Sequence, residues 1–362
     1  MSNMYLDINE LATKEVHFII GSGRSGTTLL ITILNANPSV LAAPEVRLCM
    51  AFYQKYAHTH PIPATFAQDL ARYADLVVRY KKKRRKRPLW IDDIESSIFT
   101  NFDTTQLAQL DYANLYKLLQ LNIEMPNKNN NEVSIIIDKN PDYTFYVELL
   151  IHLFPNAKFV VSMRDYRSVV SSYKHHQGKR IESCTLNAFL WNKFNTEIAR
   201  LRDLYPNKIL ILRYEDLVQD TEKIIRQSCD FLQIPFQEAM LTPHQNLEKQ
   251  AQTLQNTEVT ARDKKKIGEL TKPINTSHLN AWKTRLTNSE INTIETLCAQ
   301  TGKLFGYQPS KQLSTTDKLK VYLFNLPRLI LANITFQLLV KNYFHLPFNL
   351  RMLLIKYLHI TR

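Results

Sequence analysis

The stretch VHFIIGSGRSGTTLL, residues 16–30, decides the fold class of this 362-residue chain. It joins an apolar run, expected to form a strand over residues 16–21, to a glycine-rich turn and a helix expected over 26–35. In such a unit the N–H groups of the turn and the positive end of the helix point at one place, which favours a phosphate. The hydroxyls of Thr27 and Thr28 can add hydrogen bonds. We therefore expect a P-loop-like phosphate-binding loop; the alternative is a plain strand-to-helix turn.

Further apolar runs alternate with helical patterns along the chain. The expected strands, at 133–138, 158–163 and 208–212, are apolar along their whole length, as in strands that are buried on both faces. Helices are expected at 65–80, 106–122, 143–154, 167–175, 184–204 and 219–233. This alternation predicts an α/β three-layer sandwich with a central parallel sheet and right-handed crossovers. We expect one domain over residues 1–310 and a basic, helical carboxy-terminal appendage over 311–362.

The net charge of +13 comes from two segments rather than from the whole chain. Residues 81–87 are seven consecutive Lys or Arg, and residues 311–362 hold eight Lys or Arg against one acid, Asp317. Removing the seven charges of each segment from the total leaves −1. Such patches suit an anionic membrane surface or an acidic polymer, or are simply solvated. Because no nucleic-acid-binding motif accompanies them, a nucleic acid is not an expected partner.

The appendage is rich in Leu, Ile, Phe and Tyr and contains Pro327 and Pro347, which predicts two short amphipathic helices divided by proline. It could pack on the core, pair with a partner or lie in a membrane interface. Its longest apolar run, 329–340, is shorter than the roughly 18–20 residues that span a bilayer. The polar, acid-containing residues 1–16 do not read as a signal peptide. We expect a cytoplasmic protein with possible membrane contact through 311–362.

No metal site is predicted from the sequence. The cysteines lie far apart, without a CxxC pair, and no His, Asp or Cys cluster has ligand spacing; the cysteines are Cys49, Cys184, Cys229 and Cys298. A reducing compartment is the simplest interpretation of the cysteine pattern.

The phosphate loop differs from that of nucleoside triphosphatases at one position. Those proteins need a Lys directly after the second glycine of the motif, whereas here Thr27 occupies that place and the cation, Arg24, comes three residues earlier. The loop is therefore better matched to an esterified phosphate bearing one further group than to a triphosphate with its metal.

At this point the chain resembles sulfotransferases that use 3′-phosphoadenosine 5′-phosphosulfate. GSGRSGTTLL is similar to that family's loop for the 5′-phosphosulfate, and FVVSMRDYRSVVSSY, residues 159–173, is similar to its 3′-phosphate element. SHLNAWKTRLT, residues 277–287, resembles the late segment that closes over the nucleotide. PEVR at 44–47 and DKNP at 138–141 look most like the tyrosylprotein sulfotransferase-like branch and its bacterial relatives. The donor-binding residues that the resemblance implies are Gly23, Arg24, Ser25, Gly26, Thr27, Thr28, Arg164, Ser172, Trp282 and Lys283.

The resemblance implies transfer of a sulfuryl group to a hydroxyl or amine acceptor, without a metal. We assign Arg24 to stabilise charge on the transferred group, Lys139 to donate to the departing oxygen, and Glu45 to act as general base. Glu45 matches the position of a catalytic Glu in the tyrosylprotein branch, and its alternative is an ion pair with Arg47 or Arg24. Four histidines are not expected to be catalytic: His17, His152, His175 and His176.

The acceptor stays open among a glycan, a peptide tyrosine, a lipid headgroup and a small metabolite. The basic run 81–87 favours an anionic glycan, and the appendage favours a lipid-linked one. Two other functions are considered. In a P-loop kinase, Asp138 at the end of an apolar run would hold magnesium. In a non-catalytic scaffold, the basic appendage would carry the binding.

Overall fold

A computed structural model describes residues 8–43, 47–84, 107–121, 129, 131–176, 183–245 and 272–358. Its centre is a five-stranded sheet of order β2-β3-β1-β4-β5, in which every neighbouring pair is parallel. The strands are β1 (Glu15–Ile20), β2 (Val40–Ala43), β3 (Ile135–Lys139), β4 (Phe159–Met163) and β5 (Ile209–Arg213). The predicted α/β class with a central parallel sheet is confirmed.

The inner strands are buried on both faces, as their unbroken apolar sequences predict. All five residues of β3 and of β4 are buried, and in β1 only Glu15 is partly exposed. The register places Phe18 opposite Asp138 on one side and opposite Phe159 on the other. Strand β2 was not predicted, because its four residues form a short edge strand without a long apolar run.

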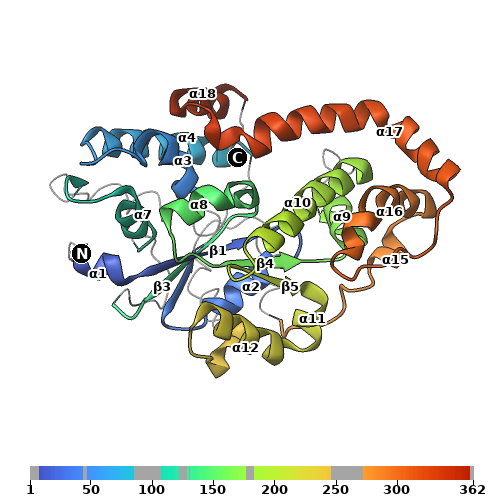
Figure 1. Cartoon of the computed structure of the whole chain (residues 1–362), viewed down its shortest axis with the longest axis horizontal. Helices are drawn as coiled ribbons and strands as arrows, with labels where there is room; N and C mark the ends of the chain where they lie inside the picture. The colour runs from blue at the N-terminus through green and yellow to red at the C-terminus, as the bar shows by residue number, and fades with distance from the viewer. Residues whose placement is uncertain are drawn as a thin grey trace.

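Helices cover both faces of the sheet (Figure 1). One face packs against α2 (Thr27–Leu34), α11 (Tyr214–Gln219) and α12 (Thr221–Leu232). The other face packs against α7 (Tyr112–Leu121), α8 (Val147–Leu153), α9 (Tyr166–His176) and α10 (Cys184–Leu204), with α16 (Asn288–Lys303) beyond α10. The described ranges also contain the α-helices α1 (Ile8–Thr13), α3 (Leu48–Tyr56), α4 (Thr65–Arg84) and α15 (Trp282–Arg285).

Most predicted helices are found with changes of a few residues at their ends, but the helix expected at 106–122 begins only at Tyr112, as α7. The helix expected at 143–154 is a 3-10 segment, η1 (Pro141–Tyr146), that continues into α8. Helix α4 extends four residues into the basic run 81–87, and residues 85–87 lie outside the described ranges. Helices α3, α11 and α16 were not predicted.

The carboxy-terminal region differs from its prediction at Pro327. Helix α17 (Thr315–Phe336) passes through this proline and continues as a π-helical segment, η5 (Gln337–Lys341), so the predicted break is wrong. The proline costs one backbone hydrogen bond, and the helix is held on both sides of it by the buried residues Asn325, Ala332 and Phe336. The second predicted break is confirmed, since η6 (Tyr343–His345) precedes Pro347 and α18 (Phe348–Leu358) follows it.

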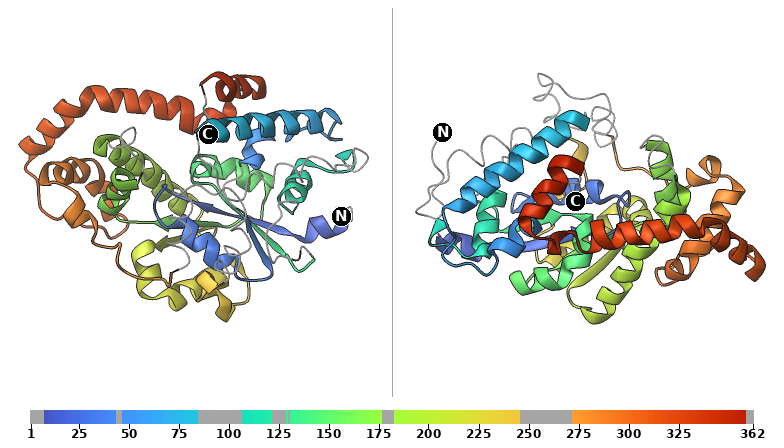
Figure 2. Two further views of the ribbon diagram at one scale, coloured as in Figure 1. Left: turned by 180° about the vertical axis from the view of Figure 1, so that it is seen from behind. Right: turned by 90° about the horizontal axis from the view of Figure 1, so that it is seen from above.

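The continuous helix also corrects the expectation about membrane-spanning length. Residues Thr315–Lys341 form 27 residues of helix that, by length and composition alone, could cross a bilayer. In the views of Figure 2 this helix runs along one side of the molecule, and α18 lies beside α4.

Candidate active site

A cavity of about 520 Å³ opens beside the loop that follows β1. Parallel α/β sheets place ligands at the carboxyl ends of their strands, where this loop and Arg164 lie. Six residues predicted to bind the donor line this cavity: Gly23, Arg24, Gly26, Thr27, Thr28 and Arg164. Its other walls come from α9, α10 and residues 272–278.

The loop backbone has the conformation of an anion cradle. Arg24 and Gly26 adopt left-handed conformations, with φ of 67° and 87°, and Thr27 begins α2 directly after Gly26. Left-handed residues next to a helix start turn successive N–H groups toward one point, and the helix dipole adds positive potential there. Since a non-glycine residue in this conformation is strained, the strain at Arg24 marks the loop as a site held in place by its surroundings.

Neighbouring elements fix the base of the loop. Gly21 N donates to Thr144 Oγ1 at 3.0 Å, and Ser162 Oγ of β4 donates to the carbonyl of Ser25 at 2.6 Å. The hydroxyls of Ser22 and Ser25 lie 2.8 Å apart. Ser25 is fully buried in these contacts, so of the predicted donor-binding residues it belongs to the scaffold of the loop rather than to the cavity wall.

Two glycines allow aromatic side chains to close around the loop. A Cβ at Gly23 would collide with the hydroxyl of Tyr173, and one at Gly26 would collide with the ring of Tyr214. Both tyrosines line the cavity. Tyr173 ends the quoted segment 159–173 but carried no prediction of its own, and Tyr214 was not predicted to line the site.

Cationic side chains converge on this place from two elements. Arg24 Nε donates to Ser172 Oγ at 3.0 Å, which joins the loop to the helix predicted to hold the 3′-phosphate. Arg164 stacks on the Tyr214 ring at 4.2 Å and donates from Nη2 to the His278 carbonyl at 2.8 Å. Arg164 is 8% exposed, and its buried Nε has no hydrogen-bond partner among the described residues. Burial lowers the pKa of Arg164, so an anion bound here would offset the desolvation of its charge.

Besides Ser25 and Ser172, four predicted residues are not found in the described cavity wall. Lys139 ends β3 and is buried, paired in register with Ile19. Trp282 and exposed Lys283 begin α15, where the Trp282 ring lies 4.5 Å from the Arg167 guanidinium. Glu45 lies outside the described residues. The roles of these four residues stay predictions.

Sequence reasoning missed several cavity residues because they come from distant segments. Arg47 was predicted as the alternative ion-pair partner of Glu45. Among the described residues its carboxylate partner is Asp142, with Arg47 Nη2 3.7 Å from Asp142 Oδ2. Lys272 and His278 complete the wall with Trp191 of α10. Arg47 and His278 belong to the quoted segments 44–47 and 277–287 but were not predicted to line the site, and Lys272 lies in no quoted motif.

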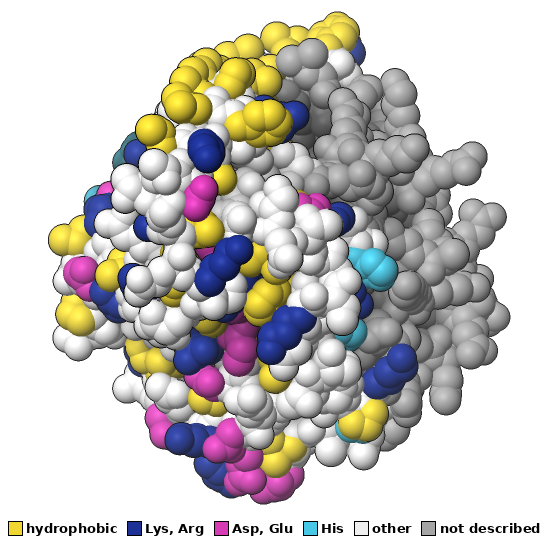
Figure 3. Space-filling view, turned by 90° about the vertical axis from the view of Figure 1, so that its right-hand side faces the viewer, with side chains coloured by type: hydrophobic (Ala, Val, Ile, Leu, Met, Phe, Trp, Pro, Cys, Tyr) yellow, Lys and Arg dark blue, Asp and Glu magenta, His cyan; other side chains and the backbone are white. Residues whose placement is uncertain are grey.

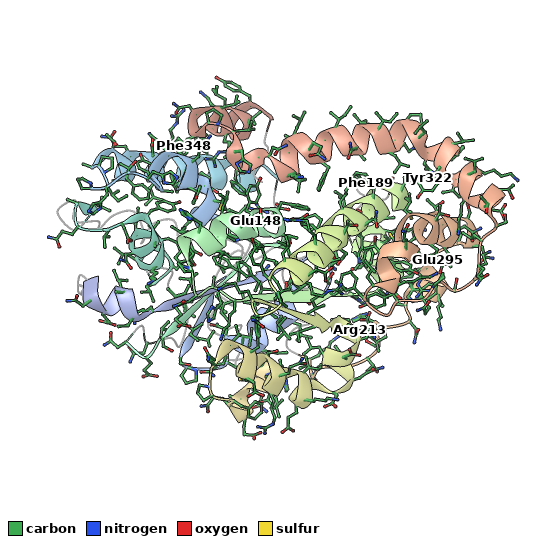
Figure 4. All side chains as sticks on the ribbon, viewed as in Figure 1. Glu148, Phe189, Arg213, Glu295, Tyr322 and Phe348 are labelled. Carbon is green, nitrogen blue, oxygen red and sulfur yellow. The ribbon has the colours of Figure 1, made fainter. Side chains whose placement is uncertain are left out.

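A buried ion network supports the helices behind the cavity. Arg167 binds Asp165 at 2.6 Å and Glu295 at 3.1 Å, and Glu295 is labelled on α16 in Figure 4. Glu215 accepts hydrogen bonds from Asp165 N and from the Tyr307 hydroxyl. Glu215, which follows β5, therefore helps to orient this network.

Asp138 does not have the environment of a magnesium ligand. It accepts hydrogen bonds from the Tyr116 hydroxyl at 2.6 Å and from Asn140 Nδ2, and its side chain is buried on the α7 side of the sheet, away from α2. Burial raises the pKa of Asp138 to about 7. The kinase hypothesis loses its support at this residue. Within the described ranges no group of three His, Cys, Asp or Glu could hold a metal ion.

His17 has the environment of a core residue. It is buried in β1 and accepts a hydrogen bond from Lys158 N through Nδ1 at 3.2 Å. Burial, with the nearby Lys158 charge, lowers its pKa to about 4, so the ring is neutral in the folded protein.

Comparison with known proteins finds distant relatives of this chain. The chain is 23% identical over 298 residues to a protein-tyrosine sulfotransferase of Drosophila melanogaster, which covers 81% of this chain and 51% of that protein. It is 24% identical over 237 residues to an uncharacterized protein of Aquifex aeolicus, covering 63% of this chain and 27% of that protein. The chain thus spans about half the length, or less, of these two relatives.

Solved structures show the same fold. The sulfotransferase domain of the Synechococcus PCC 7002 olefin synthase superposes with a TM-score of 0.50 at 22% identity, over 82% of this chain and 96% of that domain. A profile of the sulfotransferase family matches residues 17–238, which include the loop after β1, β3, and the Arg164–Ser172 segment. This chain therefore belongs to the sulfotransferase family.

Proposed function

We propose that this sulfotransferase moves the sulfuryl group of 3′-phosphoadenosine 5′-phosphosulfate to a hydroxyl or amine acceptor. The observation that carries the proposal is the buried Arg164, with an unpaired Nε, beside an anion cradle in one cavity. The cavity volume of about 520 Å³ lies in the range of small-molecule sites.

The residues present fit a donor with two anionic ends. The loop Gly23–Thr28 and the start of α2 would hold the 5′-phosphosulfate, and Arg164 with Ser172 would hold the 3′-phosphate. Family membership and the quoted motifs support this division of roles. When bound, the donor supplies the sulfuryl group and accepts the leaving charge.

The chain's own residues would then position the reactants and stabilise charge. The Arg24 guanidinium and the loop N–H groups would stabilise negative charge on the sulfuryl oxygens. Lys139 at the end of β3 would donate a hydrogen bond to the leaving oxygen. A Glu45 carboxylate oxygen would take the acceptor's proton. Support for Glu45 comes from sequence position and from Arg47, two residues later, which lines the cavity.

The charge of the described wall bears on the acceptor. Arg47 and Lys272 line the cavity in addition to Arg24 and Arg164, against one acidic side chain, Asp142. This excess of cations, with the basic run at 81–87, favours an acceptor that is itself anionic, such as an acidic glycan or a lipid-linked glycan. The relatives named as protein-tyrosine sulfotransferases make a peptide tyrosine the second acceptor class to test. We also propose that the protein acts in the cytoplasm, a reducing compartment that agrees with its cysteine pattern.

The donor is tested first by thermal shift with adenosine 3′,5′-bisphosphate, beside adenosine triphosphate with magnesium. A specific ligand at about 100 times its Kd adds about 2.7 kcal/mol of stability. We expect the bisphosphate to stabilise the protein and Arg164→Ala and Ser172→Ala to remove the effect. Arg202→Ala, at an exposed arginine of α10 that pairs with Asp203, is the matched control and should leave the shift intact.

The outcomes separate the functions. Stabilisation by the triphosphate alone would revive the kinase hypothesis and remove the roles given to Lys139 and Glu45. For the base, Glu45→Gln should keep bisphosphate binding and lose turnover with the acceptor. If turnover is unchanged in Glu45→Gln, another group takes the proton. If no turnover is found and neither Lys139→Ala nor Glu45→Gln changes what the protein does, a non-catalytic scaffold is favoured.

A further inference from the structure

Helix α17 presents an unusually apolar surface to solvent. Nine of its large hydrophobic side chains, counting the π-helical extension, are between 44% and 77% exposed: Leu319, Tyr322, Leu323, Phe324, Leu326, Ile330, Leu331, Ile334 and Leu338. We call these residues the α17 outer face. Hydrophobic side chains gather along the top of the face drawn in Figure 3, at the height where Figure 1 places α17. Contiguous exposed apolar area of this kind marks an interaction site rather than an ordinary monomer surface.

The outer face is opposite the side that packs on the core. The buried side of α17 consists of Asn325, Ala332 and Phe336. The exposed residues Leu323, Ile330 and Ile334 each lie two positions before one of these buried residues. Two residues turn about 200° around an α-helix. One side of the helix therefore packs on the core, and on the other side the described residues stay exposed, with the Tyr322 hydroxyl alone reaching α16, where it lies 3.5 Å from the Thr296 carbonyl.

Exposed cations flank the outer face. Lys318, Lys320 and Arg328 lie on α17, and Lys341 and Lys356 follow it, all exposed. Residues 311–362 contain one acid, Asp317, which accepts a hydrogen bond from the Ser314 hydroxyl at the start of α17. An apolar face bordered by Lys and Arg and almost free of acids is complementary to a surface that is apolar inside and anionic outside.

The ends of α17 are attached to the core, which bears on how it meets a bilayer. Phe336 packs against Phe145 and, in one buried cluster, against Phe194 and Phe189 of α10; Figure 4 labels Phe189 below the helix. The Val340 carbonyl accepts a hydrogen bond from the Tyr146 hydroxyl at 3.0 Å. To cross a membrane the helix would have to leave these partners, whereas lying on the surface keeps all of them.

Helix α18 strengthens this attachment. Arg351 is 1% exposed and donates from Nη2 to the Ala51 carbonyl at 2.6 Å and from Nε to the Leu346 carbonyl at 3.0 Å. On its outer side Leu350, Leu353 and Tyr357 are exposed. The chain after α17 is thus folded onto α3 and α4 and cannot act as the far side of a spanning helix without breaking buried hydrogen bonds.

We infer that the α17 outer face docks in the plane of an anionic lipid bilayer, with its apolar side chains in the interface and its cations at the headgroups. This inference does not depend on the donor or acceptor of the proposed function. It assigns a membrane surface as the occupant of the exposed face, and it makes the helix peripheral rather than membrane-spanning.

Vesicle flotation of the full chain tests it, using phosphatidylcholine vesicles with and without phosphatidylserine. We expect flotation with the phosphatidylserine vesicles, weaker flotation without them, and a decrease at high salt. Leu323→Gln/Ile334→Gln should weaken binding by at least about tenfold, since both side chains would be buried in the interface. Leu204→Gln/Leu304→Gln is the matched control, because these leucines are 53% and 55% exposed but lie outside α17, and it should bind as the parent does.

Each other outcome overturns the inference. Absence of flotation, or equal losses in both double variants, removes the membrane as the occupant. Resistance of the vesicle-bound protein to alkaline carbonate means that the helix spans the bilayer. A dimer in light scattering that Leu323→Gln/Ile334→Gln dissociates, without vesicle binding, makes a second copy the occupant. The bisphosphate thermal shift of the α17 variant should be unchanged, so failure here is distinguishable from failure of the proposed function.

Discussion

At the residue scale, the two glycines of the loop after β1 perform different tasks. Gly26 has a left-handed φ of 87° and faces the Tyr214 ring, so both its conformation and its surroundings exclude a side chain. Gly23 has no left-handed φ, and the nearest atom that a Cβ would meet is the hydroxyl of Tyr173. Gly26 is therefore required by the backbone conformation, whereas Gly23 is required by one neighbouring atom, the Tyr173 hydroxyl oxygen.

This difference predicts a selective rescue. Gly26→Ala should weaken bisphosphate binding by about 1–3 kcal/mol, or about 5- to 150-fold, because of left-handed strain. Gly23→Ala should weaken it less, and Tyr173→Phe should restore most of that loss by removing the obstructing hydroxyl. Titration calorimetry of both variants, each with and without Tyr173→Phe, makes the comparison. Equal losses at the two glycines, with no rescue at Gly23, would contradict this account.

At the scale of elements, the buried Arg167 joins α9, α15 and α16. Burial lowers the pKa of Arg167, and the hydrogen bonds and charge of Asp165 more than offset this, so the pKa is raised overall. Removal of the guanidinium would leave Glu295, 2% exposed, as an uncompensated buried carboxylate. Arg200 also binds two acids, Glu197 and Glu148, but its side chain is 45% exposed.

Arg167→Met should therefore lower the free energy of unfolding by about 3–5 kcal/mol. Arg200→Met should lower it by about 0–1 kcal/mol, since an exposed ion pair adds little. Urea denaturation of the two variants decides, and comparable losses would mean that burial does not set the strength of the Arg167 network.

The elements also show what sequence can and cannot predict. The helix expected at 184–204 has those limits in the structure, because its length and period are strong local signals. Strand β2 was missed, and the break at Pro327 was wrong, because an edge strand and a packed helix are decided by their neighbours. In the site, Gly23–Thr28 and Arg164 were found through motifs. Arg47, Lys272 and His278 were not predicted to line the cavity, because their place beside the loop depends on how distant segments fold together.

At the scale of the whole molecule, the cavity and the buried side of α17 meet in one cluster of side chains. Phe194 lines the cavity and lies in the same buried cluster as Phe336 of α17. That cluster and the helix α17 itself therefore lie between the proposed site of transfer and the proposed membrane surface. This arrangement fits an acceptor that is presented at a bilayer.

Two buried groups on neighbouring strands of the sheet, His17 of β1 and Asp138 of β3, give the molecule opposing pH dependences. The pKa of His17 is lowered from 6.5 to about 4 by burial, so the unfolded chain binds more protons between those values, and stability rises with pH. The pKa of Asp138 is raised from 3.8 to about 7 by burial, so the folded chain binds more protons between those values, and stability falls with pH. Between about pH 4 and 6.5 the two effects oppose each other.

Removing either group should expose the other. Relative to the parent, Asp138→Asn should make the free energy of unfolding rise more steeply with pH over that window, and His17→Gln should make it fall, each by up to about 1.4 kcal/mol per pH unit. Chemical denaturation at several pH values between 4 and 8 measures both slopes, with exposed His152→Gln as the control. Slopes parallel to the parent in both variants would show that neither group titrates differently on folding. Opposite changes of slope would show that the core of the sheet, rather than the charged surface, sets the acid response of the fold.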